Sequence, residues 1–214
     1  MAKIKSGAAR APARRDAQGS AKREAILEAA KRLFLLEPYD RVSMDAIAAA
    51  ADVSKVTIYA HFDSKEGLFI AAMGAGCLAL FDAAAIDAKR SGDLQAALAD
   101  LGFRFVENIT SPDVSALHGV MIAENQRGGG LTQMFYDAMV ARSIETLAAL
   151  LAQAAAEGKL DCPDPRCAAV QFIAMVQGDF FYRHQLGLDG PSKAALRRYA
   201  QDCARVFVRG YRPG

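Results

Sequence analysis

Three serines, Ser43, Ser54 and Ser64, constrain the fold more than any other feature of this chain. Each precedes residues that favour a helix, and a serine side chain in that position can accept a hydrogen bond from an N–H of the first helical turn. Val42 and Ile47 flank the first serine as a hydrophobic staple, and Val53 and Ile58 flank the second. Because these caps follow one another so closely, the helices between them are expected to be shorter than three turns.

The residues between the first two short helices predict a tight turn. Asp52 lies in the segment Ala51-Asp52-Val53, and aspartate is one of the few non-glycine residues that tolerate the left-handed backbone conformation. The alanine run 48–51 keeps the first helix thin, so that the second can approach it closely. Together these features predict a helix-turn-helix.

Composition favours helices throughout the chain. Hydrophobic residues make up 52% of it, tryptophan is absent and alanine is abundant, which is typical of an all-α protein. We expect about nine helices in three parts: a flexible basic arm over 1–19, a three-helix domain over 20–66 that contains the helix-turn-helix and begins at an N-cap on Ser20, and a larger helical domain over 67–214. Beyond the helix-turn-helix, apolar periodicity predicts helices over about 68–88, 94–109, 114–126, 131–156, 166–186 and 192–209.

Charge is distributed unevenly along the chain. Residues 1–65 hold 12 Lys and Arg against 8 Asp and Glu, although the formal net charge of the whole chain is only +2. A basic N-terminal part suits a polyanion, whereas a solvated tail is the alternative that this feature alone leaves open.

The second short helix predicts a surface for the major groove of DNA. Val56, Thr57 and Ala60 are suited to thymine methyl groups, and Lys55 to a guanine edge or a phosphate. Hydroxyl, imidazole and ammonium groups nearby are suited to phosphate oxygens. The residues expected to contact DNA are Arg14, Arg15, Lys22, Ser43, Ser54, Lys55, Val56, Thr57, Tyr59, Ala60, His61 and Lys65.

Residues 43–68, SMDAIAAAADVSKVTIYAHFDSKEGL, closely resemble the DNA-binding domain of the TetR family. Tyr59, Phe62, Lys65 and Leu68 match the family pattern, whereas Asp52 replaces the usual turn glycine and Gly67 stands where Glu or Ala is more common. Beyond residue 120, the segments MIAENQRGGGLTQMFYDA and LAALLAQAAAEGKLDCPDPRCAAVQFIAMVQGDFFYRHQLG more loosely resemble the AefR-like branch, whose members often control efflux or membrane-related genes. The Gly128-Gly129-Gly130 stretch departs from that branch.

The resemblance implies a C-terminal domain that binds a small molecule and dimerises through its last two helices. An apolar effector pocket is expected to involve Phe103, Phe105, Met121, Phe135, Met139, Phe172 and Met175, although such side chains more often only pack helices. His118, Glu124 and Asn125 are polar residues able to orient a ligand. The expected dimer interface comprises Phe172, Val176, Phe180, Arg183, His184, Leu196, Tyr199, Cys203 and Val206.

Other classes of protein find little support in the sequence. It contains none of the common catalytic motifs, Cys162 and Cys167 lack the spacing and the neighbouring histidine of a zinc site, and buried free thiols are the simplest role for the four cysteines, with redox sensing left open. No cofactor is expected. The sequence has no signal-peptide pattern and no run of 18 apolar residues, so we expect a cytoplasmic protein without a membrane partner.

These features predict a homodimeric transcriptional repressor. It would bind a palindromic operator in double-stranded DNA and leave it when an unidentified small effector binds. An activator or dual regulator of the same fold is the main alternative, and a helical enzyme is a distant one.

Overall fold

The computed structural model describes residues 12–128 and 130–214. These residues form eleven α-helices and two short helices of other types, and no strand occurs among them, which confirms the all-α prediction. The chain divides into two compact units, the first ending at Ala72 and the second spanning Met73–Gly214. The division falls inside helix α4 (Lys65–Ser91), somewhat later than the expected boundary after residue 66.

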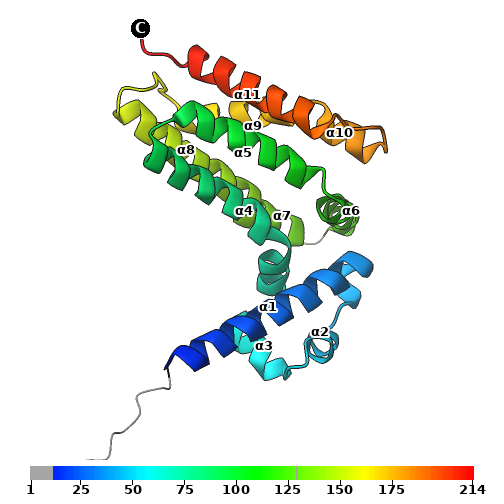
Figure 1. Ribbon diagram of the computed structural model, residues 1–214. Helices are drawn as coiled ribbons and strands as arrows, with labels where there is room; N and C mark the ends of the chain where they lie inside the picture. The colour runs from blue at the N-terminus through cyan, green and yellow to red at the C-terminus, as the bar shows by residue number, and fades with distance from the viewer. Residues whose placement is uncertain (1–11, 129) are drawn as a thin grey trace, which may run out of the picture. The chain divides into compact units, whose positions relative to one another are not determined.

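The first unit contains four elements before α4: α1 (Pro12–Leu36), the 3₁₀ turn η1 (Tyr39–Arg41), α2 (Met44–Ala50) and α3 (Lys55–His61) (Figure 1). Its core contains three aromatic rings, and the centroids of Phe34, Tyr39 and Phe69 lie 5.0 to 5.6 Å apart in pairs. Because the three rings come from α1, η1 and α4, their packing holds these elements together.

Helix α1 begins earlier than expected. The predicted N-cap Ser20 lies inside the helix, where its hydroxyl is 3.4 Å from Glu24 Oε1. Residues 12–19 were predicted to belong to a flexible arm, and this is wrong for their backbone. Alanine, arginine and glutamine favour a helix, and Pro12 can occupy the first helical position without losing a hydrogen bond. The rest of that predicted arm, 1–11, lies outside the described residues.

The second unit packs its helices around α5 (Leu94–Ile109), which lies along α11 (Lys193–Gly210) in Figure 1. Its core contains side chains such as Leu98, Leu151 and Phe172, which are fully buried. The remaining elements of this unit are α6 (Pro112–Gln126), α7 (Leu131–Phe135), the π-helical turn η2 (Tyr136–Ala141), α8 (Arg142–Ala156), α9 (Pro165–Gln177) and α10 (Phe180–Gln185).

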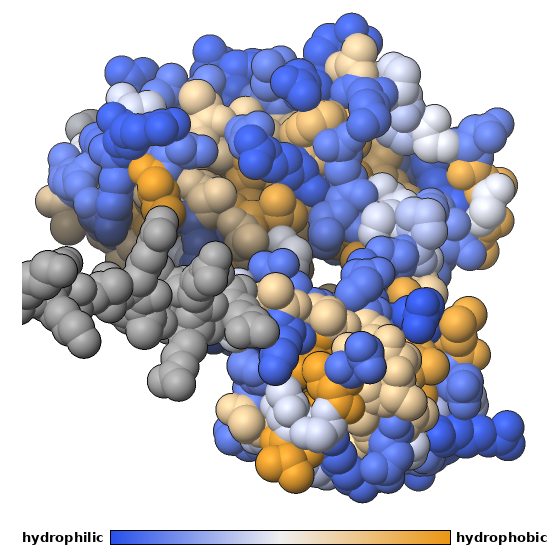
Figure 2. Space-filling view, turned by 60° about the horizontal axis from the view of Figure 1, so that its bottom comes forward, coloured by the Kyte–Doolittle hydropathy of each residue, from blue (hydrophilic) through white to orange (hydrophobic). Residues whose placement is uncertain are grey.

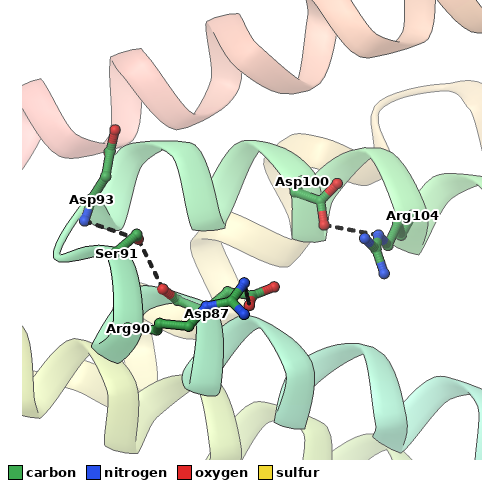
Figure 3. A network of polar contacts seen from close by, with 6 residues as sticks. All are labelled: Asp87, Arg90, Ser91, Asp93, Asp100 and Arg104. Atoms are coloured by element: carbon green, nitrogen blue, oxygen red, sulfur yellow. Dashed lines mark hydrogen bonds and ion pairs between the residues drawn. The ribbon is translucent and has the colours of Figure 1, made fainter.

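A short polar network marks the connection from α4 to α5 (Figure 3). The Ser91 hydroxyl donates to the Asp87 carbonyl at 2.8 Å and accepts from the Asp93 backbone N–H at 3.2 Å. The Asp93 carboxylate in turn caps α5 by accepting from the Ala96 N–H at 2.9 Å. These bonds satisfy backbone groups at the end of one helix and the start of the next.

Two predicted helices are interrupted, which explains why the helices outnumber the expected nine. The segment predicted as one helix over 131–156 contains the π turn η2, whose Met139 packs so closely on Gly74 that a Cβ at Gly74 would overlap it. The segment predicted as one helix over 166–186 is broken at Gly178, where φ is 52° and ψ is −139°. The first break packs Met139 on Gly74, which is distant in sequence, and the second falls on a glycine, the residue that best tolerates this backbone conformation.

The break at Gly178 gives a stability prediction. Gly178→Ala should lower the free energy of unfolding by about 1–3 kcal/mol, because an L residue is strained at this φ and ψ. The new Cβ would also lie 3.0 Å from the Tyr199 hydroxyl oxygen. Urea unfolding at a fixed protein concentration measures the loss. Gly187→Ala is the matched control, since Gly187 also has a positive φ but open space around it; an equal or larger loss there would contradict the role given to Tyr199.

Candidate nucleic-acid interface

Three serine caps build the helix-turn-helix, as the sequence predicts. The Ser43 hydroxyl accepts from the Ala46 N–H at 3.0 Å and begins α2. Ser54 accepts from the Thr57 N–H at 3.1 Å and begins α3, and Ser64 accepts from the Gly67 N–H at 3.0 Å at the start of α4. The predicted caps are therefore confirmed at all three positions.

Asp52 adopts the left-handed conformation expected of the turn. Its φ is 52°, and among the described residues it is the only non-glycine with a positive φ. The Val53 N–H donates to the Ala48 carbonyl at 3.0 Å and the Asp52 N–H donates to the Ala49 carbonyl at 3.4 Å. This pair of bonds is a Schellman motif, which ends α2 and turns the chain toward α3.

The two faces of α3 differ sharply. Ile58 and the following Phe62 are buried, as are Val42 and Ile47 of the first predicted staple. On the opposite face Val56 is 78% exposed and Tyr59 45% exposed. Lys55, Ala60 and His61 are also exposed, whereas Thr57 is half-buried. The exposed face therefore combines the apolar side chains of Val56 and Ala60 with the polar groups of Lys55, Tyr59 and His61.

Two hydrogen bonds hold polar side chains at the start of α3. Lys55 Nζ lies 2.9 Å from Asp45 Oδ2, in the first turn of α2. The hydrogen bond and the negative charge of Asp45 raise the pKa of the Lys55 ammonium. The Thr57 and Ser54 hydroxyls share a second hydrogen bond of 2.8 Å. Sequence reasoning missed Asp45, because the contact joins residues on two different helices.

The remaining residues that were predicted to contact DNA lie in different environments. Lys65 Nζ donates to the Tyr39 carbonyl at 2.5 Å and lies 4.1 Å from the Tyr39 ring centroid, so this side chain ties α4 to η1. Lys22 is exposed on α1. The structure does not describe the side chains of Arg14 and Arg15. A cation not predicted as a contact, Arg23, lies 5.3 Å above the Phe62 ring.

Four of the expected effector residues, Phe103, Phe105, Phe172 and Met175, belong to one hydrophobic core of the second unit or pack against it. Phe105 packs edge-on against Phe81, and Phe172 against Phe207. Phe103 lies under the Arg197 guanidinium, 4.3 Å from it, in a surface groove of about 510 Å³ between α5 and α11. Met139 is buried on Gly74, while Met121, Phe135 and Met175 are half-buried. The predicted pocket remains a prediction.

Among the polar residues named as possible ligand contacts, two face the interior. Glu124 is 4% exposed and pairs with Arg127 at 2.6 Å. The His118 ring lies edge-on to Phe181 with centroids 4.9 Å apart, and burial lowers the pKa of this histidine. Its Nδ1 is buried and has no hydrogen-bond partner in the described part of the chain. Asn125 is exposed.

The expected dimer interface needs correction, because Phe172, Val176, Leu196 and Cys203 are buried in the core of their own unit. Helical periodicity identifies an apolar face without identifying which neighbour covers it. Most of the other expected interface residues have contacts within their own unit. Tyr199 donates to the Met175 carbonyl and packs on Phe180, Arg183 donates to the Asp189 carbonyl, and His184 shares a hydrogen bond with Ser115. Of the expected interface residues only Val206 is largely exposed, at 53%.

Other apolar side chains lie exposed on the C-terminal helices. Figure 2 shows one face of the molecule, mostly hydrophilic and interrupted by groups of apolar residues. On and after α9 the large exposed apolar residues are Val170, Tyr182, Leu186, Leu188 and Val206. Of this set, sequence reasoning assigned only Val206 to the dimer interface.

One segment has the length and apolarity of a membrane span. It is Leu131–Ala156, and 44% of its most apolar window is buried inside the protein. Leu147 and Leu151 belong to the core of the second unit. The same features are found in the core helix of a water-exposed domain, so this segment is weak support for a membrane protein.

Two family models match the chain. Residues 26–72 match the model described as bacterial regulatory proteins of the tetR family. Residues 96–213, more than half of the chain, match the C-terminal domain of AefR-like transcriptional repressors. The two matches fall on the helix-turn-helix unit and on the larger helical unit.

Solved structures and a curated protein agree with these matches. A TetR-family transcriptional regulator from Mesorhizobium loti is 24% identical, with a TM-score of 0.71 over 91% of this chain and 98% of that one. The flavonoid-responsive regulator FrrA is 30% identical, with a TM-score of 0.67 and the same two coverages. The DNA-binding transcriptional repressor TetR of Mycobacteroides abscessus is 41% identical over 59 residues, 28% of this chain and 31% of that protein.

The burial of Phe172 gives a second stability prediction. Phe172→Ala should lower the free energy of unfolding by about 3–5 kcal/mol, because it leaves a cavity in the core. Ile86→Ala is the control, since Ile86 is an exposed apolar residue on α4, and it should change stability by less than about 0.5 kcal/mol. Urea unfolding of both variants measures the two changes in the free energy of unfolding. If Phe172→Ala weakened dimerisation while leaving unfolding unchanged, the sequence-based assignment of this residue to the interface would be right.

Proposed function

Because the chain belongs to the TetR family of bacterial transcriptional regulators, we propose that it is a homodimeric repressor of the genes near its operator. In this proposal the dimer binds a palindromic site through two copies of α3 and leaves it when a small apolar effector binds. Control of efflux or membrane-related genes and a cytoplasmic location are parts of the same proposal.

The observation that carries the proposal is the exposed face of α3. Val56 and Ala60 offer methyl groups that suit thymine methyls, and Lys55 offers donors for a base edge. Tyr59 and His61, with Ser43 at the N-terminus of α2, supply donors for phosphate oxygens. A face that exposes both methyl groups and hydrogen-bond donors on a short, capped helix is well suited to the major groove.

Dimerisation is supported by the exposed apolar residues of the C-terminal helices. Val170 on α9 and Val206 on α11 leave apolar area in water that a second copy would cover. For both copies of α3 to enter successive major grooves, the dimer must hold them about 34 Å apart.

The effector step is supported by α6 and by one relative. Only Leu117 and Glu124 are buried on this 15-residue helix, so α6 is held by few apolar contacts. A helix held in this way can shift at low cost when a ligand binds beneath it. FrrA, 30% identical, is described as flavonoid-responsive, which fits a planar, largely apolar effector here. Ligand binding would change the spacing of the two α3 helices through α4, which spans both units.

The DNA-binding prediction concerns Tyr59. The wild-type protein should form a salt-dependent, specific complex with the intergenic DNA upstream of its own gene. Tyr59→Ala should raise the Kd of that complex at least about tenfold, because it removes a hydrogen bond to a charged phosphate. Electrophoretic mobility shifts across a salt series measure both effects.

A matched control is available for this measurement. Tyr136 is 44% exposed, close to the 45% of Tyr59, and lies in the second unit. Tyr136→Ala should leave the Kd unchanged. Equal losses from both variants would argue against α3 as the reading helix.

The dimer prediction concerns Val206. Val206→Glu should convert the dimer into a 22.8 kDa monomer, because the interface would then bury an unpaired carboxylate. Sedimentation equilibrium measures the mass, and circular dichroism checks that the helices remain. Gln201→Glu is the control, since Gln201 lies on the same helix but lines the groove toward α5. A Val206→Glu protein that stayed dimeric would place the interface elsewhere.

A further inference from the structure

One ion pair of the helix-turn-helix joins its two helices across the turn. Asp45 lies in the first turn of α2, and Lys55 is the first residue of α3. Their charged atoms are 2.9 Å apart, and the side chains remain 72% and 46% exposed. The pair therefore lies at the exposed N-terminal end of the reading helix, next to Val56.

Folding stability does not explain this pair. An exposed lysine–carboxylate pair adds little to stability, because water screens its attraction and both side chains lose freedom. A carboxylate beside a DNA-facing helix also repels phosphates, so Asp45 works against general affinity for DNA. Neither folding stability nor general affinity for DNA accounts for a carboxylate in this position, which leaves contact with a base as a role for it.

The chemistry of the pair matches one kind of base pair. In the major groove a G·C pair shows the acceptors O6 and N7 on guanine beside the N4 amino donor on cytosine. Lys55 Nζ has three donors, of which Asp45 uses one, and the Asp45 carboxylate keeps free lone pairs. The bonded side chains thus present donors beside an acceptor, the complement of that edge. An A·T pair would instead place the thymine O4 or methyl group against the carboxylate.

We propose that Asp45 and Lys55 together read one G·C base pair in each half of the operator. Lys55 donates to guanine O6 and N7, and Asp45 accepts from the cytosine N4 amine. This inference rests on the proposed DNA-binding function. Asp45 has two roles in it: it contacts the base directly, and it keeps the Lys55 ammonium away from the neighbouring phosphates.

The test is selection from a randomised DNA duplex library, followed by sequencing. It uses the full-length wild type and the variants Asp45→Ala, Asp45→Asn, Lys55→Ala and Asp45→Ala/Lys55→Ala. The wild type should select a two-fold symmetric site with G·C at one position of each half. Asp45→Ala should reduce the G·C preference at that position at least about fivefold, which follows from the energy of one good base contact. Lys55→Ala should reduce it at the same position, and the double variant should lose little more than either single variant.

Asp45→Asn and a charge control separate base reading from simple charge removal. Asp45→Asn keeps the shape of the side chain but offers an amide, so it should also lose the G·C preference. Asp63→Ala removes one exposed carboxylate between α3 and α4, and it should keep the base preference of the wild type. If Asp45→Ala and Asp63→Ala both only tightened binding to all sequences, the base-reading role of Asp45 would be overturned.

The remaining outcomes are also distinguishable. If the wild type selects no sequence, the proposed operator binding fails and this inference fails with it. If the wild type selects a symmetric site and Asp45→Ala, with unchanged helix content, keeps its full base preference, only this inference is overturned. Lost preference at one shared position in both single variants would support it.

Discussion

The exposed face of α3 depends on how α2 ends. Helix α2 stops at Ala50, where Asp52 takes the left-handed conformation. The Ala48 carbonyl then accepts from the Val53 N–H, and the Ala49 carbonyl from the Asp52 N–H. Ser54 then begins α3 almost at once. Because the connection is so short, the start of α3 returns to the first turn of α2, where Lys55 meets Asp45. A longer or looser turn would separate these two side chains and leave the exposed face of α3 without a fixed orientation.

The parts of the structure that sequence reasoning predicted well are those with local causes. A serine cap involves residues three positions apart, and a Schellman turn involves residues within one helical turn, so their signals can be read from neighbouring letters. Ser20 shows where this reasoning fails. It has the same chemistry as the other caps, but the alanine, arginine and glutamine residues before it favour a helix, and α1 continues through Gly19 and Ser20 from its start at Pro12. A cap residue marks a helix start only where the preceding chain cannot continue the helix.

The interface and pocket assignments could not be settled by sequence, because they depend on which neighbour covers each apolar face. Phe172 and Cys203 have the periodicity expected of an interface, yet they face the interior of their own unit, while Val170 and Val206 face solvent. The break at Gly178 lies beside Tyr199, and Met139 of the π turn packs on Gly74. Such contacts join residues far apart in the chain, and a periodic pattern in one helix carries no information about its partner.

Positive charge is distributed unevenly between α3 and the rest of the first 65 residues. The exposed face of α3 carries one lysine, and that lysine is already bonded to a carboxylate, so α3 itself adds little general attraction for phosphates. Most of the positive charge of residues 1–65 lies elsewhere, above all among residues 3–23 of the sequence. Non-specific binding scales with the number of phosphates neutralised, whereas base preference comes from groove contacts. A protein arranged in this way would draw its affinity from the basic N-terminal residues and its choice of site from α3, so the two properties could change independently by mutation.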